Sequence, residues 1–194
     1  MLAARGAYLI QADHIAHELM QPGQAVYDEV VRHFGKDILQ PDGTIHRPKL
    51  AEAAFGPLST GGVSRINELN RIVHPAVIRR EDEWMDEVQR KEPKAIAVVE
   101  AALTIEAGAA DRFDRLIVVT CSDEQRVQRF AQRLKIDLKR ARQEVQRRMA
   151  AQLPDSVKVQ RADYVIDNSG SLDATEDQVE RVYGLLQREV AQHS

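Results

Sequence analysis

The chain has 194 residues, with 43% hydrophobic and 29% charged side chains, which is enough for one compact domain with a sizeable core. Its single cysteine excludes an internal disulfide framework and favours a reducing, cytoplasmic setting. The net charge of −3 argues against a surface devoted to nucleic acid, and no apolar run approaches the roughly 18 residues of a membrane span. We therefore expect a cytoplasmic globular protein with neither nucleic acid nor membrane as its partner.

Short apolar runs predict four strands, and helical periodicity occupies most of the chain between them. The first strand is expected to end at Gln11-Ala12-Asp13, and a helix follows it as far as Pro22-Gly23. The apolar pattern from 24 to 91 is helical throughout, and Pro75 is expected to begin the last helix of that stretch. We place the strands at 7–10, 95–99, 116–119 and 164–166, and the closing helix from Thr175.

Continuous apolar runs, as in Ala95–Val99, are typical of parallel strands that are covered on both faces. Strands that alternate with helices predict an α/β fold with a mostly parallel sheet, into which the stretch 24–91 is inserted as a helical lobe. Two helix starts are also predicted, with Ser122 and Gln125 as a capping box and Asp137 as the cap of the next helix.

Polar side chains stand where the predicted strands end. They are Asp13, Glu100, Thr120 and Asp167-Asn168. Ligands of open parallel sheets bind at this edge, and carboxylates there suit a phosphate ligand with a cation or the acceptance of a hydroxyl proton. The alternative is that each residue is an ordinary cap or turn residue.

A basic segment runs from Arg126 to Arg148, with nine Lys or Arg against two acids. It could be a solvated helix face, a nucleic-acid patch, or a lid whose arginines close over phosphates. His14 and His17, three residues apart on a helix, could be drawn as metal ligands, but without a third ligand we favour a plain helix surface.

A set of ordered motifs resembles the dephospho-CoA kinase family over nearly the whole chain. The motifs are Leu9–Asp13, Pro22-Gly23, Phe34-Gly35, Asp42–Ile45, Leu69-Asn70 with His74-Pro75, Ala102–Glu106, Val118-Val119, Arg148 with Gln152, and Ala162–Gly170. The resemblance implies a P-loop kinase core (1–23, 92–125 and 162–194), a helical CoA-binding lobe (24–91) and an Arg-rich lid (126–161).

The implied reaction moves the γ-phosphoryl group of ATP, with Mg²⁺, to the 3′-hydroxyl of dephospho-CoA, the last step of coenzyme A synthesis. The resemblance gives each matched residue a role. Asp13 is the base toward the hydroxyl, Arg133 and Arg148 are the lid arginines, Asn168, Ser169 and Gly170 lie near the adenine, and His74 and Glu100 bind the substrate.

Three departures from the family pattern stand out. Gln11 replaces the first carboxylate of an Asp-Ala-Asp tripeptide, Ala102 replaces a proline, and no G-x-x-x-x-G-K-[ST] phosphate loop occurs in the 194 residues. We expect that the chain begins just after that loop, through a misplaced start, and that the polypeptide has negligible kinase activity. The alternative is a non-catalytic relative that binds CoA-type ligands or a partner. A nucleoside or shikimate-type kinase would not explain the stretch 24–91.

Overall fold

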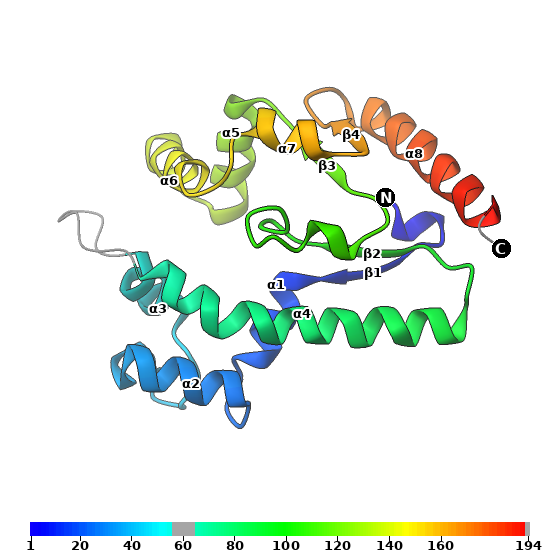
Figure 1. Cartoon of the computed structure of the whole chain (residues 1–194). Coiled ribbons are helices and arrows are strands. Elements are labelled where there is room, and N and C mark those ends of the chain that lie inside the picture. The colour runs from blue at the N-terminus through cyan, green and yellow to red at the C-terminus, as the bar shows by residue number, and fades with distance from the viewer. Residues whose placement is uncertain (56–64, 193–194) are drawn as a thin grey trace. The chain divides into compact units, whose positions relative to one another are not determined.

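The computed structural model describes residues 1–55 and 65–192 and is traced in Figure 1. It contains two compact units. We call Tyr8–Ala101 the N-terminal unit, and Met1–Ala7 together with Ala102–Ser194 the C-terminal unit. The finer division into core, lobe and lid stays a prediction. Within the described ranges, no helix combines the length and the apolar character needed to cross a bilayer.

The N-terminal unit joins a pair of parallel strands to four helices. Strand β1 pairs with β2 in a register that sets Tyr8 beside Ala97 and Gln11 beside Glu100, so both strands end at the same level. The predicted strands are therefore confirmed, within a residue or two. The elements are β1 (Tyr8–Gln11), α1 (Ala12–Leu19), α2 (Ala25–Phe34), the 3₁₀ turn η2 (Lys36–Ile38), α3 (Arg47–Phe55), α4 (Ile66–Lys91) and β2 (Ala97–Glu100).

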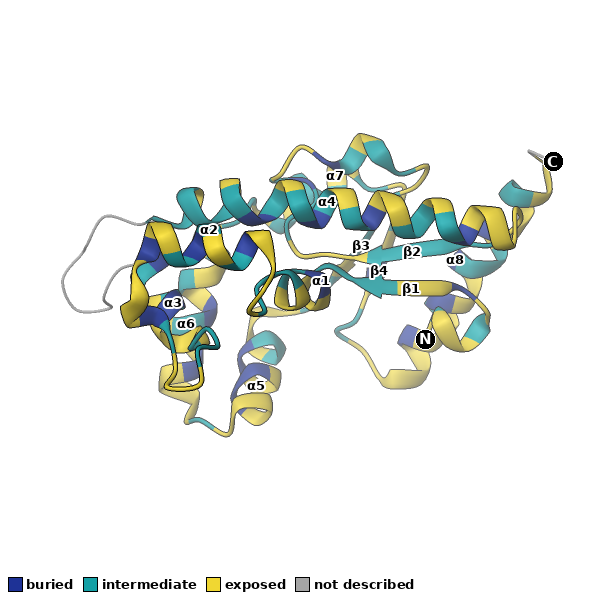
Figure 2. Ribbon diagram, turned by 90° about the horizontal axis from the view of Figure 1, so that it is seen from below, coloured by how far each residue is buried: buried dark blue, intermediate teal, exposed yellow. Residues whose placement is uncertain are grey.

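One apolar cluster holds these helices together. Val30 and Ala54 are completely buried in it, and Ile15 and Ile38 nearly so. Helix α4 contacts α1, α2 and α3, and Figure 2 shows dark-blue positions recurring along its length. The spacing of these positions is helical, because residues four apart lie on one face of a helix. The packing of α4 against α1 therefore holds α1 in place directly after the end of β1.

Helix α4 differs from the prediction, since Pro75 lies inside it rather than at the start of a new helix. A proline in a helix interior loses one hydrogen bond and costs about 3 kcal/mol. Val73 and Val77, on either side of Pro75, are both buried in the same cluster. Packing on both sides therefore offsets the cost of the proline, and the helix continues to Lys91.

The C-terminal unit contains the second strand pair and the predicted lid. Strand β3 is parallel to β4, with Thr120 beside Asp167, while α8 packs on β4 and α5 packs on α6. The elements are the 3₁₀ turns η1 (Ala3–Arg5) and η3 (Ala110–Arg112), β3 (Ile117–Thr120), α5 (Asp123–Leu134), α6 (Leu138–Ala150), α7 (Asp155–Arg161), β4 (Tyr164–Asp167) and α8 (Leu172–Gln192).

Two predictions about helix starts need correction. The Ser122 hydroxyl caps α5 as predicted and also donates to the Gln125 side-chain oxygen at 3.4 Å. The box is not completed, because the Ser122 amide donates to the Ser169 hydroxyl rather than to Gln125, and the Gln125 amide nitrogen donates to the Ser169 carbonyl oxygen at 2.6 Å. The closing helix starts at Leu172 rather than at Thr175, because the Ser171 hydroxyl accepts a hydrogen bond from the Ala174 amide. The cap at Asp137 is confirmed, with its carboxylate 2.9 Å from the Arg140 amide.

The predicted parallel pairing is confirmed, but in the described part of the chain the four strands form two two-stranded sheets instead of one. A ladder requires a neighbouring strand about 4.8 Å away on its open side. Among the described residues, β2 pairs only with β1, and β3 only with β4. Each unit therefore carries its own pair of strand ends, and the candidate site has to be built from each of them separately.

Candidate functional site

In the N-terminal unit, the carboxyl ends of β1 and β2 bring Gln11 and Glu100 into contact. The Gln11 side-chain amide donates to the Glu100 carboxylate at 3.1 Å. This contact follows from the parallel register, because side chains of paired residues project on the same side of the ladder. Glu100 is exposed, and one of its oxygens is engaged by the neutral amide.

Asp13 follows directly, in the first turn of α1. Its side chain is exposed, and it makes no hydrogen bond or ion pair with any residue in the described ranges. A carboxylate in the first turn of a helix is favoured by the partial positive charge of that end. Asp13 is thus a carboxylate at a parallel strand end that has its oxygens available for a ligand, as a proton acceptor requires.

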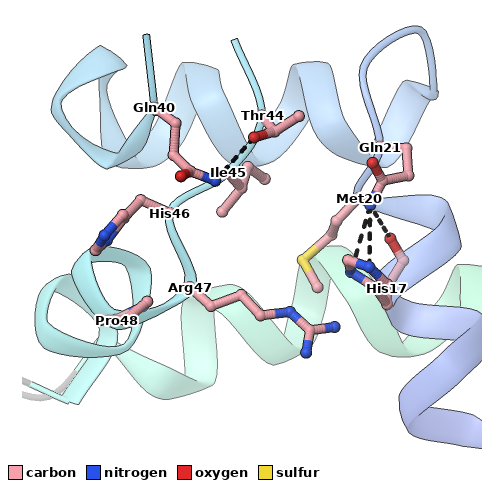
Figure 3. Close-up of a pocket in the computed structure, with 9 residues that line it drawn as sticks. All are labelled: His17, Met20, Gln21, Gln40, Thr44, Ile45, His46, Arg47 and Pro48. Carbon is pink, nitrogen blue, oxygen red and sulfur yellow. Dashed lines mark hydrogen bonds between the residues drawn. The ribbon is translucent and has the colours of Figure 1, made fainter. Parts of the chain in front are cut away.

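The same unit contains a pocket of about 410 Å³. In Figure 3, Arg47 at the start of α3 extends toward His17 on α1, with the Met20 side chain above its guanidinium. The wall is completed by the end of α1 and by the loop that leads into α3. The lining residues are His17, Met20, Gln21, Gln40, Thr44, Ile45, His46, Arg47 and Pro48.

His74 lies elsewhere, in the middle of α4, and does not line that pocket. It is half-buried, and burial lowers the pKa of its imidazole, while the nearby charge of Glu81 opposes the shift. A neutral imidazole beside Pro75 is compatible with a ligand contact or with a packing role. Among the described residues, no hydrogen bond or ion pair joins His74 to Asp13 or Glu100.

In the C-terminal unit, the two predicted lid arginines share one aromatic ring. The guanidinium carbon of Arg133, at the end of α5, lies 5.5 Å from the centre of the Phe130 ring, and that of Arg148, at the end of α6, lies 5.1 Å from it. Both distances are within the range of cation–π attraction. Phe130 is itself 6% exposed, so a buried ring orients two exposed cations.

Glu144 adds a charge to the same helix pair. Its carboxylate accepts from Arg147 at 2.8 Å and from Arg148 at 3.1 Å. Burial favours the neutral acid, but the hydrogen bonds from the two arginines outweigh it and lower the pKa of Glu144. Arg148 therefore has one anionic partner at rest. Arg133 makes no ion pair or hydrogen bond within the described ranges.

The loop after β4 is attached to the start of α5. The Ser169 hydroxyl accepts from the Ser122 amide at 3.1 Å, and the Asn168 carbonyl accepts from Arg129 at 3.1 Å. Together with the bond from Gln125, these contacts connect the loop Asn168–Gly170 to the helix that carries Arg133. The structure thus brings the predicted adenine loop and one predicted lid arginine onto a common support.

The motif Ala102–Glu106 has a structural task in the same unit. The Glu106 carboxylate accepts from Lys158 at 2.9 Å and from the Leu153 amide at 3.0 Å. Both side chains are largely buried, and an ion pair with little water access is screened less than a surface pair. This contact anchors the segment between α6 and α7.

Several of these residues could not be singled out from the sequence. Arg47 and Gln40 carry no motif, and Thr44 belongs only to the motif Asp42–Ile45. Phe130 lies on the apolar face of its helix, and such a pattern does not reveal the two cations beside the ring. As to a metal, the described residues contain no group of three or more His, Cys, Asp or Glu that could hold an ion. Kinase Mg²⁺ is usually held by one or two carboxylates and the phosphates, and Asp13 fits that limited role.

Comparison with known proteins identifies the family. The family model of dephospho-CoA kinase matches residues 1–174. This chain belongs to the dephospho-CoA kinase family. It is 40% identical over 172 residues to the dephospho-CoA kinase of Corynebacterium diphtheriae, covering 88% of this chain and 80% of the relative. It is 34% identical over 182 residues to that of Corynebacterium efficiens, covering 94% and 86%.

A solved structure has a similar fold. The crystal structure of TT1252 from Thermus thermophilus superposes with a TM-score of 0.71 at 28% identity, covering 95% of this chain and 87% of that chain. The predicted membership of the dephospho-CoA kinase family, its class as an ATP-dependent phosphotransferase and its P-loop-kinase-like α/β fold are thereby confirmed. The roles of single residues are proposals, and they are argued next.

Proposed function

We propose that Asp13 is the base in the transfer of the ATP γ-phosphoryl group to the 3′-hydroxyl of dephospho-CoA. The observation that supports this role is the contrast at one strand end. Glu100 is engaged by Gln11, whereas the exposed Asp13 carboxylate makes no hydrogen bond or ion pair within the described ranges. In the reaction the 3′-oxygen forms a bond to the γ-phosphorus, the bond from that phosphorus to the β–γ bridging oxygen breaks, and Asp13 takes the hydroxyl proton.

The remaining predicted residues complete this proposal. Arg133 and Arg148 supply positive charge for the phosphate oxygens, since phosphoryl transfer depends mainly on positioning and charge neutralisation. The loop Asn168–Gly170 lies against the adenine, and His74 and Glu100 contact the acceptor. Bound Mg²⁺ would neutralise charge on the phosphates, and Asp13 is the carboxylate that would hold it. The single cysteine supports the cytoplasm as the place of this reaction.

A second candidate function is binding of CoA-type ligands without catalysis. The sequence feature that favours it is the absence of G-x-x-x-x-G-K-[ST] from the 194 residues. That loop surrounds the phosphates with backbone amides and supplies a lysine, so a polypeptide without it lacks several charge-stabilising contacts at once. An assay of ADP release with dephospho-CoA separates the two functions for this polypeptide. ATP-dependent formation of CoA would exclude the non-catalytic candidate.

The role of Asp13 can be tested by calorimetry with two ligands. We expect Asp13→Ala to weaken binding of dephospho-CoA about tenfold, because a hydrogen bond to a charged group contributes about 1.5 kcal/mol or more. A 3′-deoxy analogue, which lacks the hydroxyl, should bind equally to the unchanged chain and to the variant. The control is Asp28→Ala, which removes an exposed carboxylate from the first turn of α2. Equal losses with both ligands would show that Asp13 does not contact the hydroxyl.

A further inference from the structure

Helix α7 is attached to both ends of the proposed lid, which consists of α5 and α6. Its first residue, Asp155, accepts a hydrogen bond at 2.6 Å from Arg126 near the start of α5 (Figure 1). Its Lys158 donates at 2.9 Å to the side-chain oxygen of Gln152, which lies two residues beyond the end of α6. One short helix therefore holds the residues at which the lid begins and ends.

The same lysine forms the ion pair with Glu106, and this carboxylate also binds the backbone after α6. The side chains of Lys158 and Glu106 are 14% and 17% exposed, and the Leu153 amide donates to the same carboxylate oxygen as the lysine. The other oxygen of Glu106 is buried and accepts no hydrogen bond from the part of the chain that the structure describes. Burial favours the neutral acid, but the hydrogen bonds, that from Lys158 first, outweigh it and lower the pKa of Glu106. The carboxylate is therefore charged near neutral pH, and Lys158 is the cation that neutralises it.

These contacts hold the backbone one helical turn after Arg148. Helix α6 ends without the left-handed residue that closes many helices, since Ala151 follows it with φ −89° and ψ −1°. The Ala151 amide donates back to the Arg148 carbonyl at 3.2 Å. Gln152 and Leu153 come next, and they are the two residues that the buried ion pair binds. The last turn of α6, which carries Arg148, is thus fixed from its C-terminal side.

We propose that Lys158 and Glu106 are positioning residues for phosphoryl transfer, because they fix the last turn of α6 and thereby the place of Arg148. The inference rests on the proposed function, in which Arg148 supplies positive charge for the phosphate oxygens. Without Lys158, the charge of Glu106 would be buried with a backbone amide as its partner, and an uncompensated buried charge is strongly unfavourable. The carboxylate would turn toward water and release the Leu153 amide. The turn that carries Arg148 would then lose its attachment.

Titration of the 194-residue chain with ATP and with adenosine, followed by NMR shifts, tests the inference. ATP carries phosphates and adenosine does not, so an effect that acts through Arg148 is confined to ATP. We expect Arg148→Gln to weaken ATP binding about 10- to 100-fold, because a charge-assisted contact is lost. Lys158→Met should weaken it by about three- to tenfold, since a displaced guanidinium keeps only part of that contact. Lys158→Arg, which keeps the charge, should recover most of the loss.

A double-mutant cycle separates positioning from a general structural role. In the Arg148→Gln background, Lys158→Met should have no further effect on ATP binding, because the residue through which it acts is already absent. Glu106→Gln is the milder second variant, since it removes the charge but keeps an oxygen for the Leu153 amide, and it should show a smaller loss confined to ATP. The matched control is Arg161→Met, which removes an exposed cation from the same helix. Arg161 makes no hydrogen bond or ion pair with any residue that the structure describes.

The outcomes separate this inference from the proposed function. If Arg148→Gln weakens ATP binding and Lys158→Met does not, the positioning role is wrong while the role of Arg148 stands. If Arg148→Gln binds ATP as tightly as the unchanged chain, or if the unchanged chain shows no saturable binding of ATP, the proposed role of Arg148 is wrong and the inference fails with it. Equal losses for ATP and adenosine, or a further loss from Lys158→Met in the Arg148→Gln background, would show general loosening and overturn the positioning role. A loss with Arg161→Met equal to that with Lys158→Met would reduce the effect to net charge and would overturn it as well.

Discussion

The shared ring of Phe130 gives a direct test of how the two arginines proposed for the lid, Arg133 and Arg148, are held. We consider the substitution Phe130→Leu, alone and combined with Arg133→Gln. Leucine keeps an apolar side chain in the cluster of Val127, Ala141 and Val145 but removes the aromatic face. Arg133 is the better second site than Arg148, because Arg148 also pairs with Glu144. The double-mutant cycle then isolates the attraction between the ring and the Arg133 guanidinium.

The expected magnitude follows from the geometry. An exposed guanidinium within about 6 Å of a ring centre contributes roughly 0.5–1 kcal/mol, and the Arg133 distance is 5.5 Å. We therefore expect a coupling free energy of about 0.5–1 kcal/mol between the two substitutions, which is about a two- to fivefold change in the opening equilibrium. Phe130→Leu alone should destabilise the α5–α6 pair by more than this, because the attraction between the ring and the Arg148 guanidinium and some packing are lost as well.

Hydrogen exchange read by mass spectrometry is the appropriate assay. The only tryptophan, Trp84, lies on α4 in the N-terminal unit, whereas exchange is read directly on the amides of α5 and α6. Exchange of the amides in Asp123–Leu134 and Leu138–Ala150 measures the local opening free energy directly. Peptides from α2 serve as the internal control, and their protection should not change.

A coupling below about 0.3 kcal/mol would contradict this reasoning, because substitutions without an interaction add within roughly that limit. In that case the ring and the guanidinium would be neighbours without a measurable attraction. The guanidinium groups of Arg133 and Arg148 would then have to be oriented without help from the ring.

Two further predictions concern single contacts. Gln125→Ala should raise the rate of amide exchange in the loop Asn168–Gly170 about fivefold, because a hydrogen bond of roughly 1 kcal/mol is lost. The control is Gln128→Ala, which changes an exposed side chain of the same helix and should leave the rate unchanged. Equal exchange rates in the two variants would contradict the attachment of the loop through Gln125. Hydrogen bonds from Arg65 and His33 lower the pKa of Glu68 to about 2 from its ordinary 4.5. An acid with a lowered pKa stabilises the fold above its ordinary pKa and loses that contribution as the pH falls toward the folded value. The difference in melting temperature between the unchanged chain and Glu68→Gln can be followed by Trp84 fluorescence. This difference should be largest above pH 4.5 and should disappear near pH 2. A difference that does not depend on pH would contradict the lowered pKa of Glu68.

The sequence was sufficient to predict the strands, because short continuous apolar runs bounded by turn residues are typical of buried strands. Its errors fall where tertiary packing decides. Pro75 is a strong local signal for a helix boundary, but Val73 and Val77 are buried in one cluster, and no local rule contains that information. In the same way, Gln125 has the spacing of a capping box but finds a stronger partner in Ser169, 44 residues away.

For the site, the sequence predicted residues that carry motifs and missed those that only the fold assembles. Asp13 was found because strand ends and their carboxylates are visible in the pattern. Arg47 was not found, because it carries no motif and only the fold places it in the wall of a pocket. The ring beneath Arg133 and Arg148 was also hidden, since an aromatic residue on an apolar stripe is normally part of the core.

The parallel register of β1 and β2 explains the effect of having Gln11 in place of the family's aspartate. A carboxylate at this position would stand beside Glu100, and two adjacent carboxylates repel each other unless a cation lies between them. Gln11 removes this repulsion and donates a hydrogen bond to Glu100 in its place. The strand end is therefore satisfied without a cation, and Asp13 is left as its exposed carboxylate without a hydrogen-bond or ion-pair partner within the described ranges. On the proposed function, a metal ion at this strand end would therefore be held by Asp13 and the phosphates rather than by a pair of carboxylates.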